Sequence, residues 1–142
     1  TFPIFNATTN TPFMPSVFTR IIQGEIPCYR IAEDADNFAF LDINPNSPGH
    51  TLCVPKQEVD KITDLSEAAY ESLMRFARKV ALAVEAAVPC KRVGMSVIGL
   101  EVPHVHVHII PLNQMADATF QNKAELSEAE FEALAKAIRA TF

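Results

Sequence analysis

The sequence lacks any pair of closely spaced cysteines. Its three cysteines, Cys28, Cys53 and Cys90, lie far apart and form no Cys-x-x-Cys motif. An odd number of widely separated thiols is typical of reduced, buried cysteines in an intracellular protein. The pattern favours free thiols over a disulfide framework, and it argues against a structural zinc site built on cysteine.

The chain also lacks an excess of basic residues and a long apolar run, and we expect no signal peptide in its first residues. Its net charge is −5 and its pI is near 5.3, which argues against a sequence-independent grip on nucleic acid but not against a local pocket for a small anion. The stretch VALAVEAAV is short and interrupted by Glu85, so no segment approaches membrane-spanning length. The first fourteen residues carry no positive charge, unlike a signal peptide. We therefore expect a cytoplasmic protein that binds neither nucleic acid nor membrane.

The length and composition indicate one domain. The chain has 142 residues, of which 49% are apolar and 20% charged, enough to bury a proper core. Residues 1–14, TFPIFNATTNTPFM, are free of charge and rich in Thr and Asn. We interpret them as an N-terminal extension, or as a remnant of cloning ahead of a natural start at Met14, and we assign residues 15–142 to a single domain.

Alternating and aromatic segments predict about five strands. They are residues 28–33, 37–43, 50–56, 92–99 and 103–112. The tight polar loop NPNSPG joins the second strand to the third. Strands joined by so short a loop pair as an antiparallel hairpin.

Helical spacing predicts three helices. A short amphipathic run in SVFTRII ends near Gly24, and Asp64 and Glu67 form a capping-box pattern ahead of the longest helix. A second capping box, Ser127 and Glu130, opens a C-terminal helix. Neighbouring strands with helices around them predict an α+β fold: an antiparallel sheet of about five strands with one long helix packed on it.

The stretch PHVHVHII contains three of the four histidines, His104, His106 and His108, at every second position. Alternate side chains of a strand share a face, so the three imidazoles are expected on one side and the valines between them on the other. Three buried imidazoles without partners would be costly, and the histidine side is therefore expected to be wet or to hold a ligand.

Three interpretations of these histidines stay open on the residues alone. The first is a polar strand face that happens to be rich in histidine. The second is a metal site, in which two histidines at i and i+2 share one ion with a ligand from elsewhere, because the outer pair lies roughly 13 Å apart on an extended strand. The third is phosphoryl or nucleotidyl transfer, with a nucleophilic imidazole and neighbours that hold phosphate oxygens and supply a proton.

Two ordered blocks of the sequence resemble the histidine triad (HIT) nucleotide hydrolases and transferases. HVHVHII matches the family's His-φ-His-φ-His-φ-φ signature, where φ is apolar, and VFTRIIQGEIPCYRIAEDADNFAFLDINPNSPGHTLCVPK is similar to its opening block. Together the blocks cover most of residues 17–112. The resemblance implies a HIT-like fold, and the branch it favours is that of the bacterial HIT-like proteins and nucleoside phosphoramidases.

The resemblance implies a role for each histidine. His106, the middle one, matches the residue that attacks the α-phosphate and becomes the nucleotidylated intermediate. His104 and His108 match the flanking positions, which orient the ring and contact phosphate or leaving group. His50 matches an upstream histidine in the same hydrogen-bonded network. The uridylyltransferases carry Gln where His108 stands, so the resemblance favours a hydrolase.

The resemblance also implies a pocket for a purine nucleoside. The matching positions are Phe18, Ile22, Phe40, Asp42 and Ile43. Asp42 is suited to accept hydrogen bonds from both ribose hydroxyls, although without the family match it is as well explained as an acid capping the turn at Asn44-Pro45.

The chain departs from the family just before the triad. Relatives have Gly-Gln-Ser/Thr-Val-x-His there, preceded by an Asn, whereas this chain reads SVIGLEVPH, with Leu100 and Glu101 in place of Gln and Ser or Thr. A carboxylate beside an anionic substrate is unfavourable unless it turns away or is protonated. Either backbone N–H groups around Gly99–Glu101 hold the phosphate, or Glu101 binds a cationic leaving group or a metal shared with the histidines.

The resemblance therefore predicts metal-free hydrolysis of a purine nucleoside 5′-monophosphate derivative at the α-phosphorus, in a homodimer, with no cofactor. The leaving group is an amine or a nucleotide, as in a dinucleoside polyphosphate. Two rivals stay open: a nucleotide-binding regulatory module with weak turnover, and a metal enzyme.

Overall fold

The computed structural model of the chain describes residues 14–142. The interpretation of residues 1–14 falls, apart from Met14, outside the described residues and stays a prediction. No helix in the described part of the chain is both long enough and apolar enough to cross a membrane.

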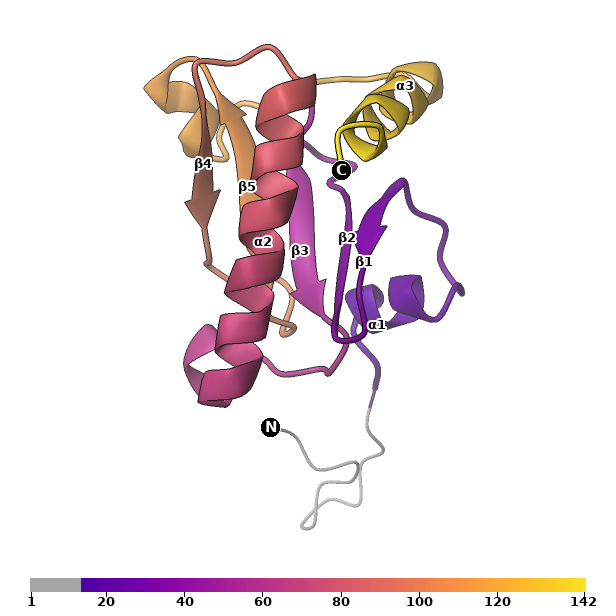
Figure 1. Cartoon of the computed structure of the whole chain (residues 1–142), viewed down its shortest axis with the longest axis vertical. Coiled ribbons are helices and arrows are strands. Elements are labelled where there is room, and N and C mark those ends of the chain that lie inside the picture. The colour runs from indigo at the N-terminus through magenta and orange to yellow at the C-terminus, as the bar shows by residue number, and fades with distance from the viewer. Residues whose placement is uncertain (1–13) are drawn as a thin grey trace.

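A five-stranded antiparallel sheet forms the centre of the described chain (Figure 1). Its strands are β1 (Arg30–Glu33), β2 (Asn37–Leu41), β3 (Thr51–Pro55), β4 (Arg92–Ser96) and β5 (Val107–Leu112), arranged in the order β1-β2-β3-β5-β4. The hairpin of β2 and β3 pairs in register from Asn37 with Pro55 to Leu41 with Thr51. The predicted α+β class, the strand number and the antiparallel hairpin are confirmed.

The long helix α2 (Glu67–Ala87) covers one face of the sheet, as Figure 1 shows. Its buried side chains recur at helical spacing and pack against the inward residues of β2, β3 and β5 in one apolar cluster. Val105, Val107 and Ile109 belong to this cluster, so the valine side of the histidine segment faces the core as predicted.

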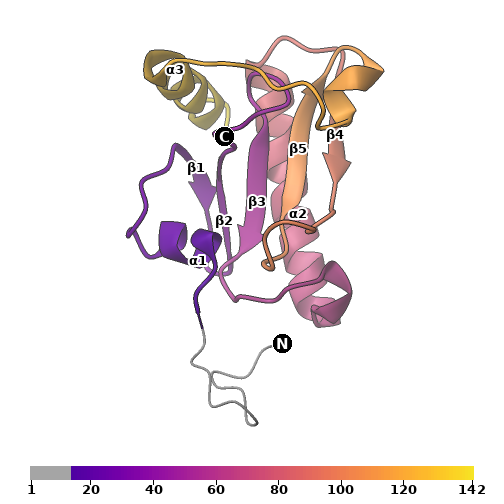
Figure 2. The same cartoon turned by 180° about the vertical axis from the view of Figure 1, so that it is seen from behind.

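The opposite face carries α1 (Val17–Ile22) and a smaller apolar cluster. Alternation along the strands separates the two clusters, because Phe38 and Phe40 of β2 point away from α2 while Ala39 and Leu41 point toward it. Figure 2 shows α1 and the β4–β5 connection on this side of the sheet. This second face holds the cleft described below.

The C-terminal helix α3 (Glu128–Arg139) packs at one end of α2 and beside β1. Its first turn has the predicted capping box, with Ser127 Oγ accepting from Glu130 N and the Glu130 carboxylate accepting from Ser127 N. Phe131 stacks on Tyr29, their ring centroids 5.0 Å apart.

Each strand is two to four residues shorter than predicted. Two of the wrong boundaries have a local cause. The N-cap of α2 is Ser66, whose hydroxyl accepts from Ala69 N, and Asp64 lies in a short 3₁₀ helix, Ile62–Asp64, instead of forming a capping box with Glu67. Strand β5 begins at Val107, because the chain bends at His104, where the backbone N–H donates to Val102 O.

We expect Leu73→Ala to lower the free energy of unfolding by about 2–5 kcal/mol, because Leu73 is fully buried on the sheet-facing side of α2 and its loss leaves a cavity. Leu82→Ala on the same helix is the matched control. The Leu82 side chain is 51% exposed, so its truncation should change stability by no more than about 0.5 kcal/mol. Urea unfolding of both variants measures the difference, and equal losses would contradict the proposed packing of α2.

Candidate active site

A cleft of about 490 Å³ opens on the face of the sheet opposite α2. His106 and His108 line it, and Phe18 borders it from α1. The β4–β5 connection contributes Gly99 to Val102, and the segment after β5 contributes Thr119, Phe120 and Lys123. Residues from four separate parts of the chain therefore converge on two of the three histidines.

His106 is oriented by its own stretch of backbone. Its Nδ1 lies 2.8 Å from the carbonyl oxygen of His104. A carbonyl only accepts, so Nδ1 carries the proton and the Nε2 lone pair is left free. Phe18 packs edge-on against the ring at 4.9 Å and His108 at 4.9 Å. The result is an imidazole with a fixed tautomer and an available nucleophilic nitrogen.

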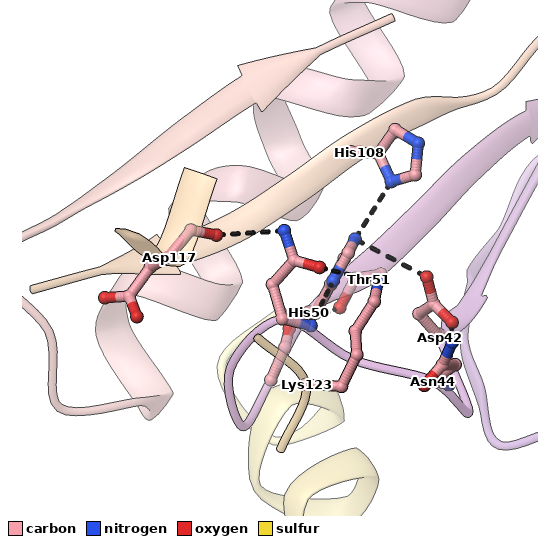
Figure 3. A network of polar contacts seen from close by, with 9 residues as sticks. Asp42, Asn44, His50, Thr51, His108, Asp117 and Lys123 are labelled. Atoms are coloured by element: carbon pink, nitrogen blue, oxygen red, sulfur yellow. Dashed lines mark hydrogen bonds and ion pairs between the residues drawn. The ribbon is translucent and has the colours of Figure 1, made fainter. Parts of the chain in front are cut away.

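His108 and His50 form a pair whose protons are also fixed by their partners (Figure 3). The backbone N–H of Asn46 donates to His50 Nδ1 at 2.9 Å, so His50 carries its proton on Nε2. His50 Nε2 donates in turn to His108 Nδ1 at 2.9 Å. His108 therefore carries its own proton on Nε2, where it is available as a donor.

His104 occupies a different environment from the other two members of the triad. It is fully buried, and it is not among the residues that line the cleft. Its Nε2–H donates to Pro55 O at 2.8 Å, and Ser16 Oγ donates to Nδ1 at 2.7 Å. In this geometry His104 connects α1 and the end of β3 to the segment that carries His106, and the expected contact of His104 with phosphate or leaving group stays a prediction.

Burial keeps three of the histidines uncharged. Desolvation is the main cause that lowers the pKa of His50 to about 3, and nearby His108 and Lys123 add to it. Desolvation likewise lowers the pKa of His108 to about 4, and the pKa of His104 also falls on burial. Neutral rings agree with the tautomers that the hydrogen bonds require.

Asp42 lies beside this pair at the end of β2 and lines the cleft. One carboxylate oxygen accepts from the backbone N–H of Asn44 at 2.8 Å, and the other lies 3.6 Å from His50 Nε2. Desolvation raises the pKa of its carboxyl group. Asp42 thus caps the turn before Pro45 and also faces the cleft, so the two interpretations of this residue are compatible.

A glycine turn places His50 at the start of β3. Gly49 adopts φ of +97°, and a Cβ at this position would stand 2.8 Å from Val88 Cγ2. The turn is closed by His50 N donating to Ser47 O at 3.1 Å. Only glycine fits both the left-handed backbone and the close approach to the end of α2.

Of the four apolar residues predicted for the nucleoside pocket, only one lines the cleft. Phe18 lines the cleft, but Ile22, Phe40 and Ile43 are not among the lining residues. Phe40 packs under Phe18 at 5.5 Å and is buried, while Ile43 is 73% exposed. Leu52 lines the cleft instead.

The β4–β5 connection offers donors to the cleft. Gly99, Leu100 and Glu101 line it, and among residues 14–142 their backbone N–H groups have no hydrogen-bond partner. Gly99 adopts φ of +74°. Ser96 lies directly across the ladder from His108, and its hydroxyl is the one buried side-chain polar atom without a partner in the described chain.

The sequence reasoning missed the residues after β5. Phe120 packs edge-on against His108 at 4.8 Å, and Lys123 Nζ lies 4.9 Å from the Phe120 ring centroid and 2.8 Å from Asn46 Oδ1. No motif marks either residue; the only signal is a single basic side chain in an otherwise uncharged stretch, residues 118–124.

One group in the described chain has a geometry that suits a metal ion. Asp42, His50 and His108 each offer a ligand atom, all within 4.8 Å of one another. Glu101, which was considered as a metal ligand, is not part of this group. A metal bound here would have to displace the proton that His50 Nε2 donates to His108 Nδ1.

Comparisons with known proteins agree on one family. A HIT domain family model matches residues 23–115. The chain is 38% identical over 100 residues to an adenosine 5′-monophosphoramidase of Schizosaccharomyces pombe, a match that covers 69% of this chain and 74% of the relative. A crystal structure of a Hit-like protein involved in cell-cycle regulation from Bartonella henselae aligns with a TM-score of 0.79 and 31% identity over 89% of this chain and 96% of that one. A hypothetical histidine triad nucleotide-binding protein from Sulfolobus tokodaii aligns with a TM-score of 0.75 and 30% identity over 87% and 89%.

We expect the free energy of unfolding to fall as the pH is lowered from about 6.5 to 5. A histidine in the unfolded chain takes up a proton near pH 6.5, whereas folded His50 and His108 stay neutral down to about 3 and about 4. Each contributes a slope of about 1.4 kcal/mol per pH unit, with stability fully present above the unfolded pKa.

Urea unfolding at several pH values between 5 and 7.5 measures this slope. The variant His50→Gln should lose about one proton's share of it, whatever its absolute stability. A stability that does not change across the window would show that the histidines titrate normally in the folded protein.

Proposed function

The chain belongs to the histidine triad (HIT) family, and on this premise we propose that it hydrolyses purine nucleoside 5′-monophosphate derivatives at the α-phosphorus. The coarser conclusion, nucleotide hydrolysis, follows from the family and from the phosphoramidase relative. The observation that carries the proposal is the pairing of a free Nε2 on His106 with a protonated Nε2 on His108 in one cleft.

The two nitrogens suit the two halves of the reaction. His106 Nε2 attacks the α-phosphorus, so that an N–P bond forms while the bond to the leaving group breaks. The leaving group takes the electron pair, and the Nε2–H of the neutral His108 ring donates a hydrogen bond to it, while the proton that the leaving group takes up comes from solvent. Water then attacks the phosphorus, loses a proton to solvent and releases the nucleotide from His106, whose Nε2 regains its lone pair.

The transferred phosphoryl group needs donors in place of the missing Gln and Ser or Thr. The unpartnered backbone N–H groups of Gly99–Glu101 are suited to this role, because these three residues line the cleft. Donors that are already in place stabilise developing charge without reorganisation. This favours the interpretation in which the backbone holds the phosphate.

Phe18, Leu52 and Asp42 are our candidates for the nucleoside side of the cleft. The carboxylate oxygens of Asp42 each keep lone pairs beyond their contacts with Asn44 and His50. They are placed to accept from the ribose hydroxyls, while the apolar residues contact the base.

We also propose a cytoplasmic homodimer. Free cysteines at positions 28, 53 and 90 favour a reducing compartment. Met95 on the edge strand β4 is half exposed, which suits burial against a second copy.

We expect the protein to hydrolyse adenosine 5′-phosphoramidate in excess chelator. His106→Ala should lower kcat at least about 10³-fold, because no other group supplies the nucleophile. Product formation by chromatography measures the rate, and AMP binding with thermal unfolding shows that the variant is folded.

Each rival predicts a different result. Activity that disappears with chelator and returns with one divalent ion would support a metal at Asp42, His50 and His108. Tight AMP binding by the parent with negligible turnover of phosphoramidate and dinucleoside polyphosphate would support a binding module. Undiminished activity of His106→Ala would remove His106 from the mechanism.

Asp42→Asn tests the ribose contact. Hydrogen bonds to a charged group contribute roughly 1.5–3 kcal/mol, so the parent should prefer adenosine 5′-phosphoramidate over its 2′,3′-dideoxy analogue by at least about 10-fold in kcat/KM. The variant should lose most of that preference. If Asp42 acts only through His50, the variant will slow both substrates equally and the preference will persist.

A further inference from the structure

Lys123 is the one basic side chain among the cleft-lining residues of the described chain. The other charged side chains there, Asp42 and Glu101, are acidic, and the protein as a whole carries a net charge of −5. An anion that enters the cleft is therefore attracted by one positive charge, that of Lys123, and repelled by the two carboxylates.

The segment that carries Lys123 is fastened to the loop after β2. Ala124 N donates to Pro45 O at 2.8 Å, and Asn46 Nδ2 donates to Asp117 O at 2.9 Å. Lys123 Nζ donates to Asn46 Oδ1 at 2.8 Å, as part of the network in Figure 3. The ammonium group is thus held in place by a neutral partner.

The hydrogen-bonding capacity of Lys123 is mostly unused. An ammonium group has three donors, and one is spent on Asn46. Among residues 14–142 it pairs with no carboxylate. Two donors and a full charge are left for a ligand.

Phe120 connects this charge to His108, the residue that we place beside the leaving group. Its ring contacts Lys123 at 4.9 Å and packs edge-on against His108 at 4.8 Å. The residue adopts φ of +64°, a left-handed conformation that is rare for residues other than glycine. The segment therefore holds a bulky ring between Lys123 and His108, whose Nε2–H the proposed mechanism assigns to the leaving group.

We propose that Lys123 binds the anionic part of the leaving group and makes the protein favour substrates in which a further phosphate follows the α-phosphate. This rests on the proposed function: of the two leaving groups considered above, Lys123 favours the nucleotide of a dinucleoside polyphosphate over an amine. Lys123 acts as a specificity residue, distinct from the histidines that carry out the transfer.

The two leaving groups make different demands. When the P–O bond to a polyphosphate breaks, the electron pair moves to the bridging oxygen and adds negative charge to a group that is already anionic. Lys123 stabilises that charge by ionic hydrogen bonds. When a P–N bond breaks, the leaving nitrogen takes up a proton and departs as a neutral amine, so it gains nothing from a nearby ammonium group.

The test compares kcat/KM for diadenosine tetraphosphate and adenosine 5′-phosphoramidate in the parent and in Lys123→Met. We expect the ratio of the two values to fall about 10- to 100-fold in the variant, the size of one charge-assisted hydrogen-bond contribution. Lys123→Arg should retain most of the ratio. Lys79→Met is the matched control, since it removes the same charge from an exposed position on α2.

The outcomes separate this proposal from the proposed function. Equal losses on both substrates would show that Lys123 acts only by holding Asn46 and His50, and would overturn the proposal, as would a parent that cleaves the phosphoramidate but not the tetraphosphate. An unchanged ratio in Lys123→Met would overturn it while leaving the proposed function intact. A parent that hydrolyses neither substrate would overturn both.

Discussion

The hydrogen bond from the backbone N–H of Asn46 to Nδ1 of His50 determines where the protons of the cleft reside. It forces His50 to carry its proton on Nε2, which makes Nδ1 of His108 an acceptor and leaves the Nε2–H of His108 facing the cleft. Burial of the pair supports the arrangement, because uncharged rings are the only ones that fit it. The donor is a main-chain group, so side-chain rotation cannot reverse it.

Much of the fold follows from local periodicity. Alternating residues predict the strands, helical spacing predicts the long helix, and the short loop predicts the hairpin. The start of α2 was misplaced by two residues because both Asp64 and Ser66 are good caps, and only the tertiary path of the chain selects between them. The triad predicted one site for His104, His106 and His108, and the cleft is lined by His106 and His108.

The contacts between segments that are distant in the sequence could not be predicted from local patterns. The partners of His104, Ser16 and Pro55, are 88 and 49 positions away, and a strand pattern assigns a face without saying what covers it. The position of Phe120 was equally hidden, since a bulky residue in a left-handed conformation is rare and no local pattern predicts it. Such strain is tolerated only where surrounding contacts fix the backbone.

The bond that orients His106 spans only two residues, from its own ring to the carbonyl of His104. His108 differs, because the position of its proton depends on a loop about sixty positions upstream in the sequence. The orientation of His106 thus depends on a neighbouring residue, whereas the proton position on His108 depends on residues far away in the sequence. To rebuild the His106 site in another scaffold, an extended His-Val-His segment with the same bend would be nearly sufficient. To rebuild the His108 donor, the turn from Asp42 to His50 would have to be included.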